Sequence, residues 1–148
     1  MEWVCKHHAE LSIHELYAVL ALRTAVFVVE QQCPYQEVDG QDLQGDTCHL
    51  MAWDADQLVA YLRLLDPATQ GGDVVIGRVV IARAARGQGL GHAMMQQALE
   101  QAQARWPATA IHLSAQAHLQ GYYGAYGFAA VGEVYLEDGI PHIGMHRA

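Results

Sequence analysis

Gly77–His92, with the sequence GRVVIARAARGQGLGH, carries the most specific pattern in this chain. An apolar run that predicts a strand ends in a basic turn, and a glycine-rich turn then precedes a segment of helix-forming composition. Glycines let the backbone approach a ligand closely and adopt positive φ angles at low cost. The helix that follows directs its free N–H groups and the positive end of its dipole at the same point. The pattern therefore predicts a binding site for an anion.

Positive charge is concentrated in this stretch. It contains Arg78, Arg83 and Arg86, although the whole chain has only eight lysine and arginine residues and a net charge of −8. No acidic residue lies between Asp73 and Glu100. A local excess of positive charge at a helix N-terminus favours phosphate groups as the anion. The acidic balance of the whole chain argues against a general nucleic-acid binder, which needs a basic face.

Length and composition predict a single globular domain that spans residues 1–148. Apolar residues make up 52% of the chain and charged residues 16%, which argues against a disordered class. No apolar run reaches about 18 residues, so we expect no membrane span, and the N-terminal residues lack the pattern of a signal peptide. Cys5, Cys33 and Cys48 are odd in number and widely spaced, which argues against a disulfide framework and indicates a reducing cytoplasm.

The first part of the chain predicts a short strand over Trp3–Lys6 and then a helix. Ser12 and Glu15 have the spacing of a capping box, and apolar residues then recur at helical spacing, so we expect a helix over Ile13–Val28. Arg23 lies on this helix. We expect a solvated side chain, or one with only its stem buried, in preference to a buried anchor for the following loop.

An acidic segment, Glu30–Asp46, follows this helix. It has no basic residue, and Pro34, Gly40 and Gly45 interrupt it, so the segment is expected to be a loop. Its five carboxylates belong to Glu30, Glu37, Asp39, Asp42 and Asp46. One interpretation is a solvated acidic loop, and the other is an entrance that attracts a positively charged substrate.

The rest of the chain predicts six further strands and two further helices. The strands are expected at His49–Trp53, Leu58–Leu65, Val74–Ile81, Ile111–Ala115, Ala130–Leu136 and Ile143–His146, the last two as a hairpin interrupted by Pro141. The helices are expected at Gly89–Arg105 and Leu119–Tyr126. A strand that follows a helix suggests a parallel crossover, so the order predicts an α/β domain with a mixed sheet.

Two motifs make the chain similar to a known family. Val79–Ile81 followed by Arg86–Gly91 resembles the [Q/R]-x-x-G-x-[G/A] signature of the GNAT superfamily of N-acetyltransferases, and Tyr123–Phe128 resembles that superfamily's Y-x-x-x-G-F helix. Two motifs in the right order are more specific than one glycine-rich turn. Leu22–Tyr35 and Asp138–Met145 resemble the ElaA-like branch of the superfamily, which extends the resemblance to nearly the whole chain.

The resemblance implies a fold and a coenzyme site. It implies a mixed, mostly antiparallel sheet flanked by helices, in which the parallel strands Val74–Ile81 and Ile111–Ala115 splay apart to admit acetyl-CoA. The pantetheine arm would pair with Val79, Val80 and Ile81, and a backbone N–H near Val79 or Val80 would stabilise the oxyanion. The pyrophosphate would lie on the turn formed by Arg86, Gly87, Gln88, Gly89, Leu90, Gly91 and His92.

The resemblance also places Tyr123 in the position of a general acid. A phenol with an ordinary pKa of about 10 can protonate the departing thiolate of the coenzyme. The alternative is that Tyr122, Tyr123 and Tyr126 only pack against the core, because aromatic residues at helical spacing usually do so.

The acceptor amine must lose a proton before it can attack, and the resemblance does not fix the base. The candidates are Glu37, Asp39, His49, Glu133 and His142. We take His142 and Glu37 forward as the expected bases, and imidazole has a suitable ordinary pKa of about 6.5.

No metal site is expected. His142 and His146 have the i, i+4 spacing of a metal-binding pair, but Pro141 and Gly144 disfavour a helix there.

These observations predict an acetyl-CoA-dependent N-acetyltransferase that acts on a primary amine of a small-molecule or peptidic acceptor. The acidic segment suggests an acceptor that is cationic overall. The alternative is a non-catalytic acyl-CoA-binding or regulatory module with the same fold. We expect neither a nucleic acid nor a membrane as partner, and an exposed edge strand in the C-terminal hairpin would permit a homodimer.

Overall fold

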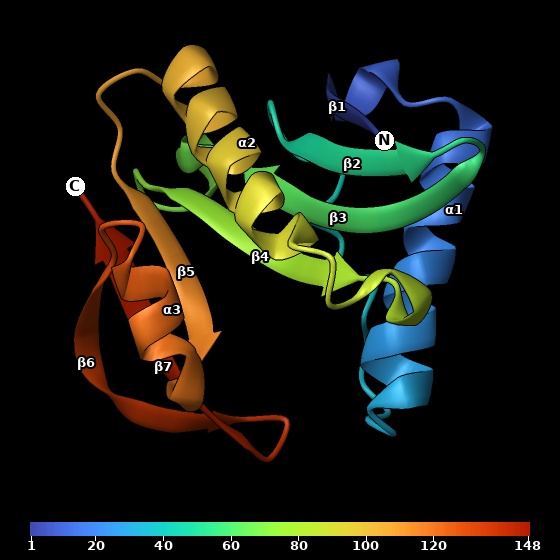
Figure 1. The fold of residues 1–148 in the computed structure, drawn as a ribbon. Helices are drawn as coiled ribbons and strands as arrows, with labels where there is room; N and C mark the ends of the chain where they lie inside the picture. Colours follow the sequence, from blue (N-terminus) through green and yellow to red (C-terminus); the bar gives the residue numbers. More distant parts are fainter.

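Seven strands form one mixed sheet, in the order β1-β2-β3-β4-β5-β7-β6 (Figure 1). The computed structural model describes residues 1–148. The strands are β1 Glu2–His7, β2 Cys48–Asp54, β3 Gln57–Leu65, β4 Val74–Ile81, β5 Ile111–Gln116, β6 Ala129–Glu137 and β7 Ile140–Arg147. Only β4 and β5 are parallel, and every other neighbouring pair is antiparallel. The predicted fold class is therefore confirmed, including the parallel crossover through a helix.

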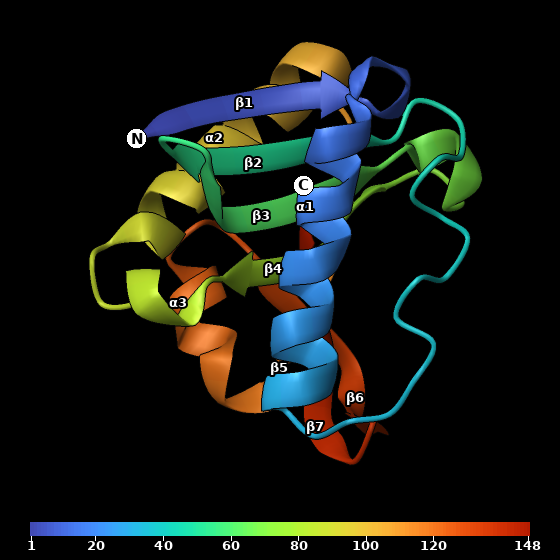
Figure 2. The ribbon, with the colours of Figure 1, turned by 90° about the vertical axis from the view of Figure 1, so that its right-hand side faces the viewer.

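Helices cover both faces of the sheet (Figure 2). They are α1 Ile13–Arg23, α2 Leu90–Arg105 and α3 Gln120–Gly124. On one face, Val19 of α1 packs with Met51 and Tyr61. On the other, α2 and α3 pack on the larger apolar cluster, because alternate side chains of each strand point to opposite faces. None of these helices combines the length and the apolar character that crossing a membrane requires.

The first helix begins where the sequence predicts and changes from an α-helix to a π-helix before it ends. The Glu15 backbone N–H donates to Ser12 Oγ at 3.0 Å, and the Ser12 N–H donates to Glu15 Oε1 at 2.8 Å, which confirms the capping box. The expected helix Ile13–Val28 is an α-helix only to Arg23, and a π-helix then continues over Thr24–Glu30. Such wide turns occur frequently at functional sites.

The C-terminal hairpin differs from the prediction at Pro141. This residue lies within β7, opposite Leu136 of β6, and does not interrupt the strand. The next residue, His142, is the first in β7 that pairs with β5, so Pro141 has a neighbouring strand on one side only. A proline is tolerated there because one side of the strand has no ladder hydrogen bond to lose. β6 is the edge strand, and all of its residues are exposed.

We expect a large difference between two leucine truncations in this sheet. Leu64 of β3 is 0% exposed, whereas Leu136 of β6 is 72% exposed. Leu64→Ala leaves a cavity in the core and should lower the free energy of unfolding by about 3 kcal/mol. Leu136→Ala should change it by less than about 0.5 kcal/mol. Urea unfolding measures both values, and equal losses would contradict the placement of the core.

Candidate active site

The parallel strands β4 and β5 pair over only three residues and then separate. Val74–Ile76 pairs with Ile111–Leu113, and no further pairing joins the two strands. Figure 1 shows β4 and β5 diverging toward their carboxyl ends. Gly77–Ile81 therefore presents a backbone edge that β5 does not cover, and the predicted splayed pair is confirmed.

A bulge in β4 lies at the point of separation. Leu62 of β3 faces two residues of β4, Arg78 and Val79, where a regular ladder has one. Arg78 has a φ of 53°, in the left-handed region. Bulges bend a strand and increase its local twist. One residue, Gly77, separates this bulge from Ile76, the last residue of β4 that pairs with β5.

The gap between the strands opens into a cavity of about 650 Å³, a size typical of small-molecule sites. β4 contributes residues 76–81 to its lining, β5 contributes Leu113, Ser114 and Gln116, and the π-helix contributes Val26, Phe27 and Glu30. The sequence-predicted residues that line this cleft are Val79, Val80, Ile81, Arg86, Tyr123 and His142. These residues lie up to 63 positions apart in the sequence, and the fold brings them into one cavity.

The predicted glycine turn leads from Arg86 into α2. Gly87 and Gly89 have φ angles of 81° and 76°, and a Cβ atom built on either would meet no atom within 4 Å. Gly89 is the N-cap of α2, and no side chain caps the helix. The first amides of α2 therefore have no side-chain partner, an arrangement suited to an anion. Residues 87–92 do not line the cavity itself and continue from its Arg86 end.

Tyr123 is buried and lines the cleft. The residue is 8% exposed, and its ring contacts Tyr122 and Phe128 edge-on at centroid distances of 5.0 and 6.3 Å. No protein group accepts or donates a hydrogen bond at its oxygen, yet this oxygen is not sealed from solvent. Burial raises the pKa of the Tyr123 phenol above its ordinary value. The group is therefore neutral at physiological pH and can donate a proton.

His142 lies on β7 with one ring nitrogen fixed. Its Nδ1 donates to the carbonyl oxygen of Ile140 at 2.8 Å, so the neutral ring carries its lone pair on Nε2. Glu137, which also lines the cleft, has a carboxylate oxygen 3.3 Å from this Nε2. Nε2 is the nitrogen that can accept a proton.

The structure does not bring the other candidate bases into the cleft. Glu37 is buried, and Arg23 and Arg78 hold its carboxylate, so the expectation that it serves as a base is corrected. His49 is fully buried between the Tyr61 hydroxyl and the Asp42 carbonyl, and burial lowers the pKa of its imidazole. Asp39 is ion-paired and Glu133 lies on the exposed edge strand β6, and neither lines the cleft.

The acidic segment is tied down by arginines. Arg23, at the end of α1, is 0% exposed, and its Nε donates to Glu37 Oε1 at 2.7 Å. Its Nη1 and Nη2 donate to the two carboxylate oxygens of Asp42 at 2.6 and 3.2 Å. Arg23 is thus a buried anchor for the loop, contrary to the expectation of a solvated or half-buried side chain.

Arg63 and Arg78 complete this network. Arg63 of β3 donates to both carboxylate oxygens of Asp39, at 2.6 and 2.9 Å. Burial opposes ionisation of Asp39, but the hydrogen bonds from Arg63 and from the Gln41 backbone, with the charges of Arg63 and Arg78, together outweigh it. They hold the pKa of this carboxyl well below its usual range. Three guanidinium groups therefore balance three carboxylates, those of Glu37, Asp39 and Asp42. This pairing is inconsistent with both interpretations of the segment from sequence. The three carboxylates are neither solvated nor free to attract a positively charged substrate.

Arg86 is also paired. Its Nη1 and Nη2 donate to the two carboxylate oxygens of Glu30 at 2.7 and 3.1 Å, and its Nε donates to the Ile81 carbonyl. The hydrogen bonds from Arg86 lower the pKa of the Glu30 carboxyl. Of the three arginines in the opening stretch, only Arg83 has no ion pair, so the local excess of positive charge is smaller than the sequence suggests.

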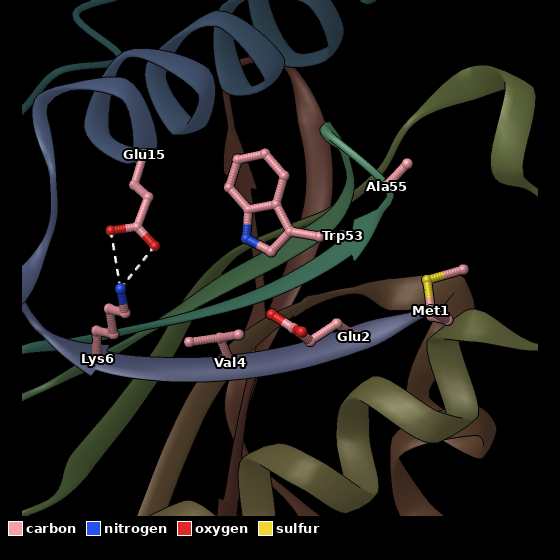
Figure 3. Close-up of a pocket in the computed structure, with 7 residues that line it drawn as sticks. All are labelled: Met1, Glu2, Val4, Lys6, Glu15, Trp53 and Ala55. Carbon is pink, nitrogen blue, oxygen red and sulfur yellow. Dashed lines mark hydrogen bonds and ion pairs between the residues drawn. The ribbon is translucent and has the colours of Figure 1, made fainter.

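A second groove, of about 550 Å³, lies at the other edge of the sheet between β1 and α1 (Figure 3). Its lining residues are Met1, Glu2, Val4, Lys6, Glu15, Trp53 and Ala55. Lys6 and Glu15 neutralise each other at 2.9 Å. The groove shares no residue with the cleft and contains none of the predicted site residues.

The cleft contains residues that the sequence patterns did not single out. Cys33 and Tyr35 line it from the loop after the π-helix, and Glu137 lies beside His142. The bulge had one visible signal, because Gly77 and Arg78 interrupt an otherwise apolar strand.

The chain matches known proteins over nearly its full length. The acetyltransferase (GNAT) domain family matches residues 12–148. ElaA of Escherichia coli (strain K12) is 53% identical over 147 residues, which cover 99% of this chain and 96% of ElaA. The crystal structure of Escherichia coli ElaA has a TM-score of 0.95 at 52% identity and covers all of both chains.

Other solved structures share the fold. An acyl-CoA N-acyltransferase from Pseudomonas aeruginosa has a TM-score of 0.98 at 69% identity, over 99% of each chain. An aminoglycoside 6′-N-acetyltransferase complexed with coenzyme A has a TM-score of 0.72 at 14% identity, over 97% of this chain and 96% of that one, which shows a common fold alone. The family match and the full-length similarity to ElaA together show that this chain belongs to the GNAT acetyltransferase family, in its ElaA-like branch.

Proposed function

We propose that the chain is an N-acyltransferase that binds acetyl-CoA in the cleft between β4 and β5 and acetylates a primary amine. The observation that carries this proposal is the uncovered backbone edge at Gly77–Ile81, which runs directly into Arg86 and the glycine turn. A pantetheine arm contains amide groups that can pair with such an edge. Family membership supports the same donor, since a coenzyme A complex is known for a protein of this fold.

The donor would lie along β4 with its thioester near the bulge. The pyrophosphate would bind the backbone amides of residues 86–91, and the pantetheine arm would pair with Val79–Ile81. The carbonyl carbon of the thioester would then lie between Tyr123 and the acceptor end of the cleft, where His142 and Glu137 lie.

Transfer would proceed by direct attack. The amine nitrogen forms a bond to the thioester carbonyl carbon, and the carbonyl oxygen becomes an oxyanion that a backbone N–H of Val79 or Val80 stabilises. The C–S bond then breaks, and Tyr123 donates its phenolic proton to the leaving sulfur. His142 Nε2 takes the proton that the amine gives up, with Glu137 beside it to stabilise the imidazolium.

The acceptor is a small-molecule or peptidic amine. A cationic acceptor has no support from the acidic loop, because Glu37, Asp39 and Asp42 are already neutralised. The lining of the cleft includes Phe27 and Tyr35 as well as Glu137, which suits an amine attached to a partly apolar body.

Replacement of Tyr123 tests the general acid. We expect Tyr123→Phe to lower kcat about 100-fold with little change in KM for acetyl-CoA, because only proton donation to the thiolate is lost. Thiol release with a panel of primary amines measures the rate. The matched control is Tyr122→Phe, since this neighbouring tyrosine does not line the cleft. Equal effects in the two variants would contradict the role of Tyr123.

If the wild-type protein binds coenzyme A but acetylates no amine in the panel, the catalytic part of the proposal is wrong. The chain would then be a binding module with this fold.

Replacement of His142 tests the base. His142→Gln should lower kcat/KM about 100-fold, because the amine then has no group in the cleft that takes its proton. His146→Gln is the control, since His146 lies on the same strand outside the cleft. Equal kcat/KM values in the two variants would exclude His142 as the base.

Charge changes at Arg86 and Glu30 test the phosphate end. Arg86→Glu should raise the Kd for coenzyme A about tenfold at low salt, because a charge-assisted contact is replaced by repulsion. Glu30→Gln should lower the Kd about twofold to threefold, because it frees the guanidinium of an exposed ion pair. Calorimetric titration measures both, with Glu100→Gln on the exposed face of α2 as the control. An unchanged Kd in Arg86→Glu would exclude the assigned phosphate site.

A further inference from the structure

Arg78 has a backbone conformation that its residue type does not favour. Five non-glycine residues have positive φ angles, and Arg78, at 53°, is the only one within a strand. The other four lie in turns: Gln32, Ala55, Ala108 and Asp138. A Cβ atom makes the left-handed region unfavourable, so other contacts must hold Arg78 there.

The side chain of Arg78 supplies these contacts. Its Nε lies 2.8 Å from Glu37 Oε1, and its Nη2 donates to the Glu37 carbonyl oxygen at 2.9 Å. The same Nη2 lies 3.3 Å from Asp39 Oδ2, and the guanidinium stands 5.7 Å from the centre of the Tyr35 ring. Two carboxylates and an aromatic face therefore hold one guanidinium group.

The two carboxylates are themselves held by buried groups. Arg23 donates to Glu37 at 2.7 Å, and Arg63 binds Asp39 through both of its carboxylate oxygens. Because Arg23 and Arg63 are both buried, the position of the Arg78 guanidinium is fixed from two elements, α1 and β3. A fixed side chain restricts the φ and ψ angles of its own residue.

We propose that Glu37 and Asp39 are positioning residues that act through Arg78 to hold the β4 bulge and so keep the edge at Val79–Ile81 open for acyl-CoA. They touch neither the donor nor the reacting atoms. The proposal rests on the proposed use of the cleft, and it gives Glu37 a role that differs from the base expected from sequence.

Two substitutions at one position separate backbone conformation from charge. Arg78→Gly and Arg78→Ala both remove the ion pairs with Glu37 and Asp39, but only glycine adopts a positive φ angle without a steric cost. We expect the Kd for coenzyme A to be about tenfold higher in Arg78→Ala than in Arg78→Gly, as calorimetric titration measures it. Equal values would mean that the φ angle of residue 78 does not affect binding of the coenzyme, which would overturn the proposal.

A double-mutant cycle tests the carboxylates. Asp39→Asn should raise the Kd for coenzyme A several-fold in the wild-type background and should have no further effect in the Arg78→Gly background. An equal effect in both backgrounds would show that Asp39 acts independently of Arg78 and would contradict its positioning role. Thermal unfolding of each variant separates this coupling from a general loss of stability.

Hydrogen exchange in the free protein provides a readout that does not depend on the coenzyme. Amides in the peptide spanning residues 77–81 should exchange faster in Arg78→Ala than in Arg78→Gly, because the strained bulge opens more often. The flexibility of glycine by itself would make these amides exchange faster in Arg78→Gly than in Arg78→Ala. Equal or reversed exchange would refute the positioning role. If exchange follows the expected order while wild-type protein fails to bind coenzyme A, the proposed function fails, and only the role of the residue 78 conformation in holding the bulge stands.

Discussion

Charge neutralisation beneath the acidic loop is the constraint on which the rest of the structure depends. Removing a charge from water is costly unless an opposite charge and hydrogen bonds replace the lost hydration. Arg23 and Glu37 are almost completely buried, so each must keep its partner. The loop between the π-helix and β2 has no regular secondary structure, yet these pairs fix it to α1, β3 and β4. A segment without regular structure is thereby tied to three regular elements.

The same contacts join the N-terminal part of the chain to the donor side of the cleft. α1 ends at Arg23 in the charge network, and the π-helix that continues it brings Phe27 and Glu30 to the cavity. The central strands supply the open backbone edge, and the C-terminal strands supply His142. Each third of the chain thus contributes to one site.

The sequence predicts much of this fold because its strongest patterns are local. β4 has the predicted bounds Val74–Ile81, since Asp73 and the turn residues delimit its apolar run. The glycine turn and Tyr123 are found by their motifs. The burial of Arg23 is not, because its partners lie 14 and 19 positions away and helical periodicity carries no information about them. The pairing of Arg86 with Glu30, across 56 positions, is hidden for the same reason.

The π-helix Thr24–Glu30 has both of its ends fixed by other parts of the molecule. Arg23, immediately before it, is anchored to the loop, and Glu30, its last residue, is bound to Arg86. Gain or loss of one residue would rotate everything beyond it about the helix axis, so the two anchors could not both be satisfied. This segment therefore acts as a spacer of set length. Across relatives, it should tolerate changes of residue type while excluding insertions and deletions.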